Sequence, residues 1–252
     1  MKKKIVSLAL VVALIAIAVG GTLAYFTDEA EATNTFTTTK INIALVEQQR
    51  GENGLEPFEQ KKVLYPIVGS AQGEKDAMGL PTAKNYVDKI ITIKNESDSD
   101  QAYVRLYIAV PSVLDNVADA GQNVLHFNYG NKFETGNYSV ADYANWGAET
   151  MLVKDFTIDG VMYNIYYRDY NKVMEKNTET GSAAYVGFYL DKGFDYDVEK
   201  GYYTINGEKI NFDFSKGVNI PVYAVGVQSA GFDTAAAAVE AAFGAGFNPW
   251  AP

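Results

Sequence analysis

The sequence predicts an all-β fold, an antiparallel sandwich of two sheets with one or two short helices, preceded by a cleaved signal helix. Three observations support this fold class. The chain contains 18 Tyr, 13 Phe and 22 Gly, with few stretches of helical period, and this composition favours strands and turns. Residues 102–110 alternate with the period of a strand that has one dry face. Asn206-Gly207 lies between two strand-like runs and is typical of a two-residue hairpin.

The N-terminus has the composition of a signal peptide. Three lysines precede an apolar run at 5–19, which ends in two glycines. The run is shorter than the roughly 20 apolar residues that span a bilayer, so removal is predicted and an uncleaved anchor is the alternative. Signal peptidase accepts small side chains one and three positions before the cut, which Ala24 and Thr22 provide. Cleavage is therefore predicted between Ala24 and Tyr25, with 1–24 as the signal peptide.

The next segments are a tail, a first strand and a long loop. Residues 25–33 are acidic and weakly patterned, and a single domain is expected over 34–252. Its first strand is predicted at 34–46, where apolar residues are spaced for one face of a pleat. The stretch at about 48–83 is rich in Gly, Glu, Gln and Lys and contains three prolines. It predicts a long loop with at most one short strand, around 63–68.

The clearest pair of strands is predicted at 86–94 and 102–110, joined by a polar turn. The turn contains Glu96, Asp98 and Asp100, whose oxygens are the ligand type that Ca²⁺ prefers. The fixed glycine and distal glutamate of an EF-hand are absent. A solvated turn is the favoured interpretation, and the three carboxylates are weak calcium candidates.

The rest of the chain is predicted to hold further strands and two short helices. A first helix is expected at 111–120, with Ser112 as its N-cap. A second is expected at 234–243, capped by Asp233 and ended by Gly244. The further strands are expected at 123–128, 161–170, 183–190, 202–205, 209–214 and 218–228.

Composition excludes several classes of protein. The chain has no cysteine, so disulfides, thiolate metal sites and a catalytic thiol are excluded. It carries 31 acidic against 21 basic residues, a formal net charge of −10. Such an acidic surface repels phosphate backbones, which argues against nucleic acid as a partner.

The residues that common hydrolases require are missing or isolated. A zinc protease needs two imidazole ligands, and His126 is the single histidine. A Ser-His-Asp site would require Ser112, Ser139 or Ser182 beside His126, and none of these serines lies in a Gly-x-Ser-x-Gly elbow. We therefore expect no enzymatic activity and no cofactor.

Two other patterns carry weaker functional interpretations. Asp195 and Asp197 could form a glycosidase pair, but with 31 acidic residues in the chain such pairs arise by chance. A stripe of tyrosines could stack on sugar rings, although cross-strand packing is the ordinary role of such residues. The stripe consists of Tyr163, Tyr166, Tyr167 and Tyr170.

Both ends of the chain carry a resemblance to a known group. Residues 20–28 read Gly-Gly-Thr-Leu-Ala-Tyr-Phe-Thr-Asp, and 34–43 read Asn-Thr-Phe-Thr-Thr-Thr-Lys-Ile-Asn-Ile. This start resembles that of the TasA/camelysin group of Gram-positive surface and biofilm-matrix proteins, where a SipW-type signal peptidase reads a Gly-Gly-Thr-x-Ala-x-Phe-x-Asp stretch. The blocks at 86–95 with 102–105, and at 222–233, are also similar to the group.

The resemblance implies a jelly-roll fold, processing by a SipW-type peptidase, and assembly into a homopolymer. In TasA-type fibres the processed N-terminus is lent as a strand to the next subunit, so a donor strand is implied within 25–33. Its candidate residues are Tyr25, Phe26, Thr27, Asp28 and Thr33. The metalloprotease activity associated with camelysin-like relatives is not carried over, because His126 lacks a second imidazole.

Elementary physical reasoning also favours assembly. A sandwich has open edges, whose unpaired backbone groups another extended segment can satisfy, and head-to-tail addition of this kind grows a filament. The sortase motif is broken in Leu80-Pro81-Thr82-Ala83, which lies in the middle of the chain, and no cysteine follows the signal for lipid attachment.

The sequence thus predicts a secreted, non-enzymatic structural protein of the cell surface or biofilm matrix. Its expected partners are further copies of itself, other matrix or cell-wall components, and the processing peptidase. The alternative is a monomeric secreted binding module, for instance one that recognises carbohydrate, in which the tail has no structural role.

Overall fold

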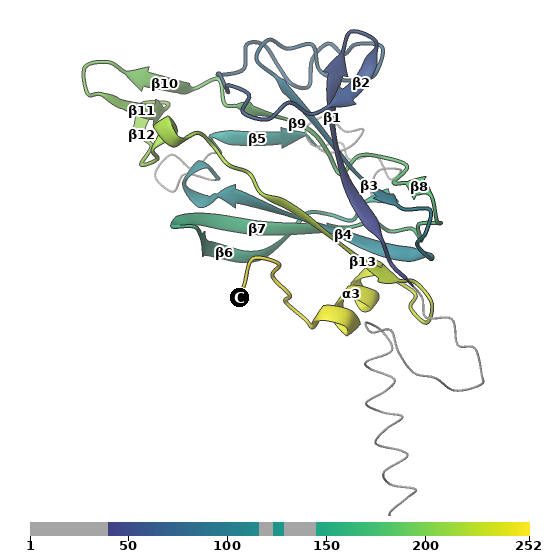
Figure 1. Cartoon of the computed structure of the whole chain (residues 1–252). Coiled ribbons are helices and arrows are strands. Elements are labelled where there is room, and N and C mark those ends of the chain that lie inside the picture. The colour runs from purple at the N-terminus through teal and green to yellow at the C-terminus, as the bar shows by residue number, and fades with distance from the viewer. Residues whose placement is uncertain (1–39, 116–122, 129–144) are drawn as a thin grey trace, which may run out of the picture. The chain divides into compact units, whose positions relative to one another are not determined.

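Two antiparallel sheets face each other, as the sequence predicts (Figure 1). The computed structural model describes residues 40–115, 123–128 and 145–252. Within these, Ile41–Pro252 belong to one unit. The signal peptide, its cleavage site and the tail at 25–33 lie outside the described residues.

The first sheet has the strand order β2-β1-β3-β9-β5, and β8 pairs with the end of β3. Its strands are β1 (Ile43–Gly51), β2 (Gly54–Pro57), β3 (Val87–Asn95), β5 (Leu125–Asn128), β8 (Thr178–Glu179) and β9 (Tyr185–Leu190). The second sheet has the order β13-β4-β7-β6. Its strands are β4 (Ala102–Pro111), β6 (Thr150–Ile158), β7 (Val161–Asp169) and β13 (Val222–Gln228). A small third sheet consists of β10 (Phe194–Asp197), β11 (Tyr202–Ile205) and β12 (Glu208–Lys209).

The chain changes sheet repeatedly, which produces the jelly-roll-like sandwich. It crosses from β3 to β4, from β4 to β5, from β5 to β6, from β7 to β8, and at the end to β13. Only β6 and β7 follow each other within the second sheet as an antiparallel hairpin. Strands that are neighbours in space are therefore often far apart in sequence.

The main core lies between the two sheets. Val104, Leu106 and Ile108 of β4 face Ile91 and Ile93 of β3 there, and all five side chains are fully buried. The β4 residues follow the period-two pattern that predicted this strand, because alternate side chains of a strand point to the same face.

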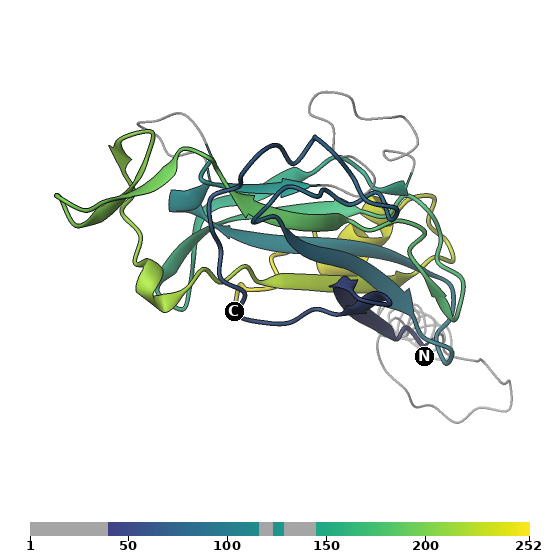
Figure 2. The same ribbon diagram turned by 90° about the horizontal axis from the view of Figure 1, so that it is seen from above.

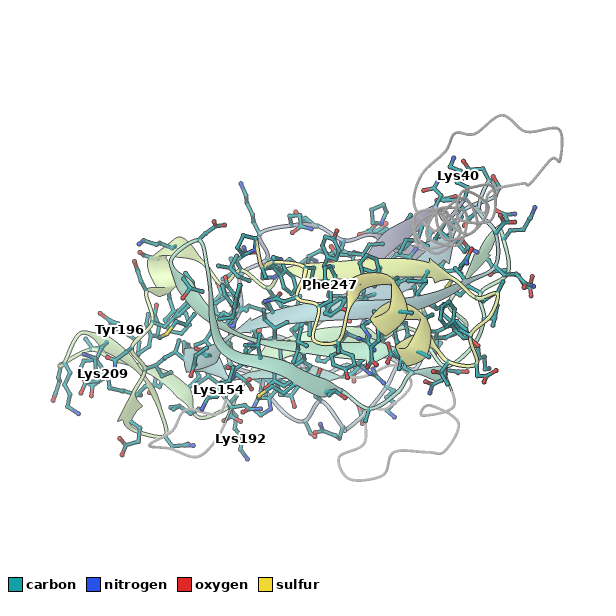
Figure 3. The ribbon with its side chains drawn as sticks, turned by 90° about the horizontal axis from the view of Figure 1, so that it is seen from below. Lys40, Lys154, Lys192, Tyr196, Lys209 and Phe247 are labelled. Carbon is teal, nitrogen blue, oxygen red and sulfur yellow. The ribbon has the colours of Figure 1, made fainter. Side chains whose placement is uncertain are left out.

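Strand β4 is buried on both faces, although its alternation predicts one exposed face. Its outer face carries Tyr103 and Tyr107, which pack with helix α3 (Ala235–Phe243) and with Phe247 and Trp250. Figure 3 shows Phe247 beside this helix. The C-terminal segment thus builds a second hydrophobic core on the outside of the second sheet.

Helix α3 corresponds to the helix predicted at 234–243, but its first residue and its N-cap differ from the prediction. Thr234, not Asp233, is the N-cap, because its Oγ1 accepts the N–H of Ala237 at 3.1 Å. Gly244 ends the helix at φ 90°, as predicted, since glycine adopts the left-handed region without a steric cost. Among the described residues, no helix is long and apolar enough to cross a membrane.

The prediction of a helix at 111–120 is wrong for residues 111–115, the part that the structure describes. Strand β4 continues to Pro111, and a single 3₁₀ turn, Ser112–Leu114, follows it. The Ser112 side chain makes no capping hydrogen bond; its Oγ donates to the carbonyl of Met162 at 3.3 Å. Residues 116–120 lie outside the described part of the chain.

Several strand boundaries also differ from the prediction. Of the strand predicted at 34–46, residues 34–39 lie outside the described part of the chain. In the described part, strand β1 covers Ile43–Gly51, and it forms a hairpin with β2. The loop expected at about 48–83 is therefore a strand pair in its first part. Strands β6 and β10 were not expected at all.

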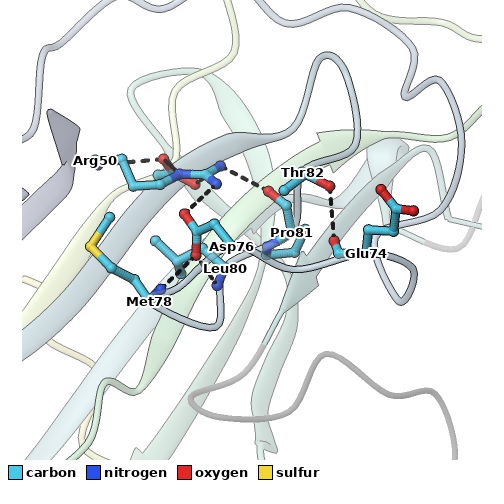
Figure 4. A network of polar contacts seen from close by, with 8 residues as sticks. Arg50, Glu74, Asp76, Met78, Leu80, Pro81 and Thr82 are labelled. Atoms are coloured by element: carbon cyan, nitrogen blue, oxygen red, sulfur yellow. Dashed lines mark hydrogen bonds and ion pairs between the residues drawn. The ribbon is translucent and has the colours of Figure 1, made fainter. Parts of the chain in front are cut away.

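The remainder of this loop is held to the sandwich by Arg50 of β1 (Figure 4). The Arg50 guanidinium donates to both carboxylate oxygens of Asp88 on β3, to Asp76 and to the carbonyl of Pro81, at 2.6–2.9 Å. Asp76 in turn accepts the N–H groups of Met78 and Leu80. A single cation thus connects the first sheet to both sides of a tight loop turn.

Candidate strand-acceptor groove

A groove lies between two segments that no sequence pattern places together. One wall is formed by 58–64, which follows β2, and the other by 214–220, which leads into β13. In Figure 1 this second segment runs from the small sheet across to β13. The groove consists of a hollow of about 710 Å³ and an adjoining one of about 110 Å³. We call it the acceptor groove.

Both walls of the acceptor groove present unpaired backbone groups. From Gln60 to Leu64, and again from Val218 to Ile220, the backbone makes no hydrogen bond with a described residue. The chain rejoins the sheets only beyond these limits, where the Ile67 N–H donates to the Leu190 carbonyl at 3.0 Å. Unpaired N–H and C=O groups on an extended segment are what an added strand satisfies.

The base of the acceptor groove is the main core itself. Leu190 and Phe188 of β9, both almost fully buried, lie at its floor with Phe194 and Tyr203. Partly buried apolar side chains line the walls and also pack against the core; they are Leu64, Phe214, Val218 and Ile220. A strand seated here would cover apolar surface, at roughly 25 cal/mol per Å² removed from water.

The electrostatics of the acceptor groove are opposite to those of the chain as a whole. Its lining contains Lys61, Lys62, Lys89 and Lys216, and no Asp or Glu, in a chain with a formal net charge of −10. Lys89 is neutralised by Glu47 at 2.7 Å. The exposed pairs Lys62–Glu59 and Lys216–Asp213 are longer, at 4.0 and 3.6 Å, and such surface pairs are weak.

One wall residue also has an unusual backbone conformation. Lys61 has φ 65°, in the left-handed region that costs a non-glycine residue of order 1 kcal/mol. Such conformations concentrate where a segment is shaped for binding. Here the turn at Lys61 places two consecutive lysines on the rim of the groove.

The weak calcium candidates are not brought together. Glu96 pairs with Lys94 at 2.8 Å, and Asp98 accepts the side-chain amide of Asn42 at 2.9 Å. The Asp100 carbonyl accepts the Asn95 amide. Within the described ranges, no three His, Cys, Asp or Glu side chains are grouped as a metal ion would require.

His126 lies on β5 and has aromatic and acidic neighbours. Its ring stacks on Tyr189 at 4.9 Å, and its Nε2 lies 3.0 Å from Asp191 Oδ2. No hydrogen bond links Ser112 or Ser182 to this ring: Ser112 donates to Met162, and the Ser182 carbonyl accepts the Trp146 indole N–H. Ser139 lies outside the described residues.

The tyrosine stripe belongs to the framework. Tyr163 is buried, Tyr166 donates to Asp115 at 2.5 Å, and the Tyr167 ring lies 4.0 Å from the Arg105 guanidinium carbon. The Tyr170 hydroxyl accepts the Gly181 N–H at 3.0 Å. Burial, followed by the bond to Asp115, raises the pKa of Tyr166.

The acidic pair at 195–197 is part of the small sheet. Asp195 accepts the N–H of Tyr196 at 2.8 Å, while Asp197 pairs with Lys200 at 3.0 Å. The hydrogen bond from Lys200 holds the pKa of Asp197 below its usual value. That shift is opposite to the raised pKa of a glycosidase general acid.

Sequence reasoning did not find the acceptor groove. Its walls lie about 150 residues apart along the chain, and antiparallel sheets do bring such distant segments together. One local signal was present. Two consecutive lysines, Lys61 and Lys62, follow Gln60 in a segment that contains several prolines, although the chain as a whole is acidic. The donor and cleavage residues from Thr22 to Thr33 lie outside the described part of the chain.

Comparison with known proteins adds no relative. No family description, no curated protein and no solved structure matches this chain.

Proposed function

We propose that the protein is a secreted, non-enzymatic structural protein that polymerises when the N-terminal leader of one copy occupies the acceptor groove of the next. The leader is defined as residues 25–33, released by cleavage between Ala24 and Tyr25. The observation that carries the proposal is the groove itself: unpaired backbone on both walls, a core-like floor and a basic rim.

The leader and the groove are complementary in charge. The leader contains Asp28, Glu29 and Glu31 and no basic residue, whereas the groove contains four lysines and no acid. Opposite charges within reach steer association and fix the register of the pair. The rest of the acidic surface repels other copies, so attraction is concentrated at this one place.

The leader also has the right length and side chains. Nine extended residues span roughly 30 Å, and the five unpaired residues from Gln60 to Leu64 span at most about 17 Å. Phe26, Ala30 and Ala32 share one face of an extended strand and supply apolar groups for the floor. The segment contains no proline, so each of its residues can donate a backbone hydrogen bond. Leader and groove are different surfaces, so addition is head-to-tail and does not close by symmetry.

The resemblance of the chain's start to the TasA/camelysin group supports the same function. It points to a SipW-type peptidase as the processing partner and to the cell surface or matrix as the location. Cleavage would then act as the switch for assembly, because the leader becomes free only when the signal peptide is removed.

The proposal is tested by reversing charges on each surface of residues 25–252. Variant A carries Asp28→Lys, Glu29→Lys and Glu31→Lys in the leader, and variant B carries a Glu at each groove lysine of the set Lys61, Lys62 and Lys216. Each variant alone should remain monomeric by size exclusion and negative-stain imaging, because like charges then face each other. An equimolar mixture should form filaments, since each leader meets a groove of opposite sign.

Two controls make the test decisive. Glu substitutions at Lys154, Lys176 and Lys192, which are exposed and do not line the groove, change the net charge equally and should leave filaments intact. The chain 34–252 should fold as a monomer. Filaments from 34–252, or a mixture of folded A and B that stays monomeric, would reject the proposal.

A further inference from the structure

The small sheet β10-β11-β12 extends beyond the end of the sandwich (Figures 1 and 2). It carries a dense group of aromatic side chains. Phe194, Tyr203 and Phe214 pack on one another, with ring centroids 4.6–5.2 Å apart. Phe194 belongs to the main core, and Tyr203 and Phe214 pack against it. These three residues anchor the small sheet and are explained by that role.

Two further tyrosines are not explained by anchoring. Tyr196 is 45% exposed, and its ring lies 4.9 Å from that of Tyr203 at 60°. Tyr202 is half-buried, and the ammonium groups of Lys200 and Lys209 lie 5.8 and 5.0 Å from its ring centre. Figure 3 shows Tyr196 and Lys209 near each other on this projecting sheet.

A hollow of about 690 Å³ lies beside these tyrosines, within the roughly 300–1,000 Å³ typical of ligand sites. We call it the hairpin hollow. Its aromatic lining residues are Tyr196, Tyr202, Tyr203, Phe212 and Phe214. Polar groups stand among the rings, namely the Asn211 amide, the Ser215 hydroxyl, Lys209 and Asp213.

The charge of the hairpin hollow distinguishes it from the acceptor groove. Its lining contains one lysine, Lys209, and one acid, Asp213, so it has no net charge to attract the acidic leader. Aromatic faces with a few polar groups and balanced charge match a ligand whose rings have apolar C–H faces and neutral hydroxyl edges. A pyranose sugar has this chemistry.

We propose that the hairpin hollow binds an uncharged polysaccharide, with Tyr196 and Tyr202 stacking on sugar rings and the polar groups bonding to hydroxyls. The site differs from the tyrosine stripe on β7 and at Tyr170 just after it, whose members are framework residues. It also differs from the acceptor groove in ligand and in charge, although Tyr203, Phe214 and Ser215 line both. A fibre with one such hollow per subunit would hold glycan at many points.

The test is calorimetric titration of residues 25–252 with cellohexaose and chitohexaose, two uncharged β-linked probes, and with hexagalacturonate as the acidic counterpart. Binding of at least one uncharged probe is expected. Tyr196→Ala and Tyr202→Ala should each weaken it at least tenfold. Tyr223→Ala is the matched control, because Tyr223 is 46% exposed on β13 and outside the hollow, and it should bind as the unaltered chain does.

Each outcome decides. The inference is wrong if neither uncharged probe binds, if only hexagalacturonate binds, or if Tyr196→Ala and Tyr202→Ala bind like Tyr223→Ala. Thermal unfolding of all three variants checks that loss of binding is not loss of fold. The inference does not rest on polymerisation: Tyr196→Ala should still form filaments, and the groove variant B should still bind the sugar.

Discussion

At the residue scale, the residue before β3 packs closely on β9 because β9 has a glycine, which carries no side chain, at the point of contact. The ring of Tyr86, just before β3, lies across Gly187 of β9, so a Cβ added to Gly187 would meet the Tyr86 hydroxyl and ring carbons at 2.4–2.6 Å. The Tyr86 hydroxyl is buried without a hydrogen-bond partner among the described residues. Burial raises the pKa of Tyr86, and the nearby Asp88 carboxylate raises it further.

Gly187→Ala should therefore destabilise the fold by about 2 kcal/mol, because the ring must leave its place and a tightly packed neighbour must shift. Chemical denaturation measures the loss. In a Tyr86→Ala background the same substitution should cost far less, since its partner in the clash is gone. Gly147→Ala, whose added Cβ would have no neighbour closer than 3.6 Å, is the matched control, and equal losses at both glycines would contradict this account.

The backbone conformation of single residues could be predicted from the sequence where it depends on local geometry alone. Asn206 and Gly207 have φ 48° and 89°, as a two-residue hairpin of this sequence requires. Gly244 ends its helix for the same local reason. Local sequence could not predict whether Asp233 or Thr234 is the N-cap, because both side chains can accept the capping hydrogen bond. The position at which the helix starts also depends on its packing against β4.

At the scale of elements, the Arg50 contacts connect β1, β3 and the loop after β2. Desolvation acts to raise the pKa of Asp76, but the Leu80 N–H and the Arg50 guanidinium outweigh it and hold that pKa below its usual value. A carboxyl whose pKa is lowered by folding stabilises the folded state above its unfolded pKa of about 3.9. That contribution is lost as the pH falls through the lower folded value.

Arg50→Met should accordingly cost about 2 kcal/mol at pH 7, because the partly buried Asp88 loses its charged donor and Asp76 loses one of its partners. The difference in stability between Arg50→Met and the unaltered chain should narrow as the pH falls below 4 through the lowered pKa of Asp76, where this carboxyl becomes protonated in the folded state of both chains. Thermal unfolding across pH 3–7 checks this. Lys94→Met, which removes the partly exposed pair with Glu96, serves as control and should change stability by less than about 0.5 kcal/mol. A gap that is constant with pH would exclude the carboxylates as its source.

Elements with a regular pattern were predictable, and irregular ones were not. Strand β4 alternates without interruption, so its existence and bounds followed from the sequence. Strand β6 breaks its register twice against β7, between Met151 and Val153 and between Val153 and Phe156. Each irregularity moves the following side chains to the other face, which destroys the period that a sequence pattern needs. Strand β10 is only Phe194–Asp197 and carries two acids.

At the scale of the whole molecule, the acceptor groove arises from topology rather than from any motif. Its two walls belong to segments before β3 and after β12, which the sandwich brings together over the main core. No local sequence pattern shows that these two segments lie side by side. The sequence therefore predicted that a sheet edge would accept a strand, but it did not predict the position of that edge. We propose the position from the lysine content of the groove, set against the acidic leader.

The absence of cysteine from the chain allows the central claim to be tested by cross-linking. Single cysteines are placed in one batch of residues 25–252 at Thr27, Glu29 or Glu31 of the leader, and in another batch at Lys62 or Ser215 of the groove. The two batches are mixed under assembly conditions and oxidised. Lys192→Cys, on an exposed residue outside the groove, replaces the groove cysteine as control.

We expect at least one leader position to form a disulfide-linked dimer with a groove cysteine, and none to do so efficiently with Cys at position 192, because a disulfide requires Cα atoms within about 7 Å. Filaments that assemble while no leader position cross-links to either groove cysteine would contradict the account, since the leader would then lie elsewhere.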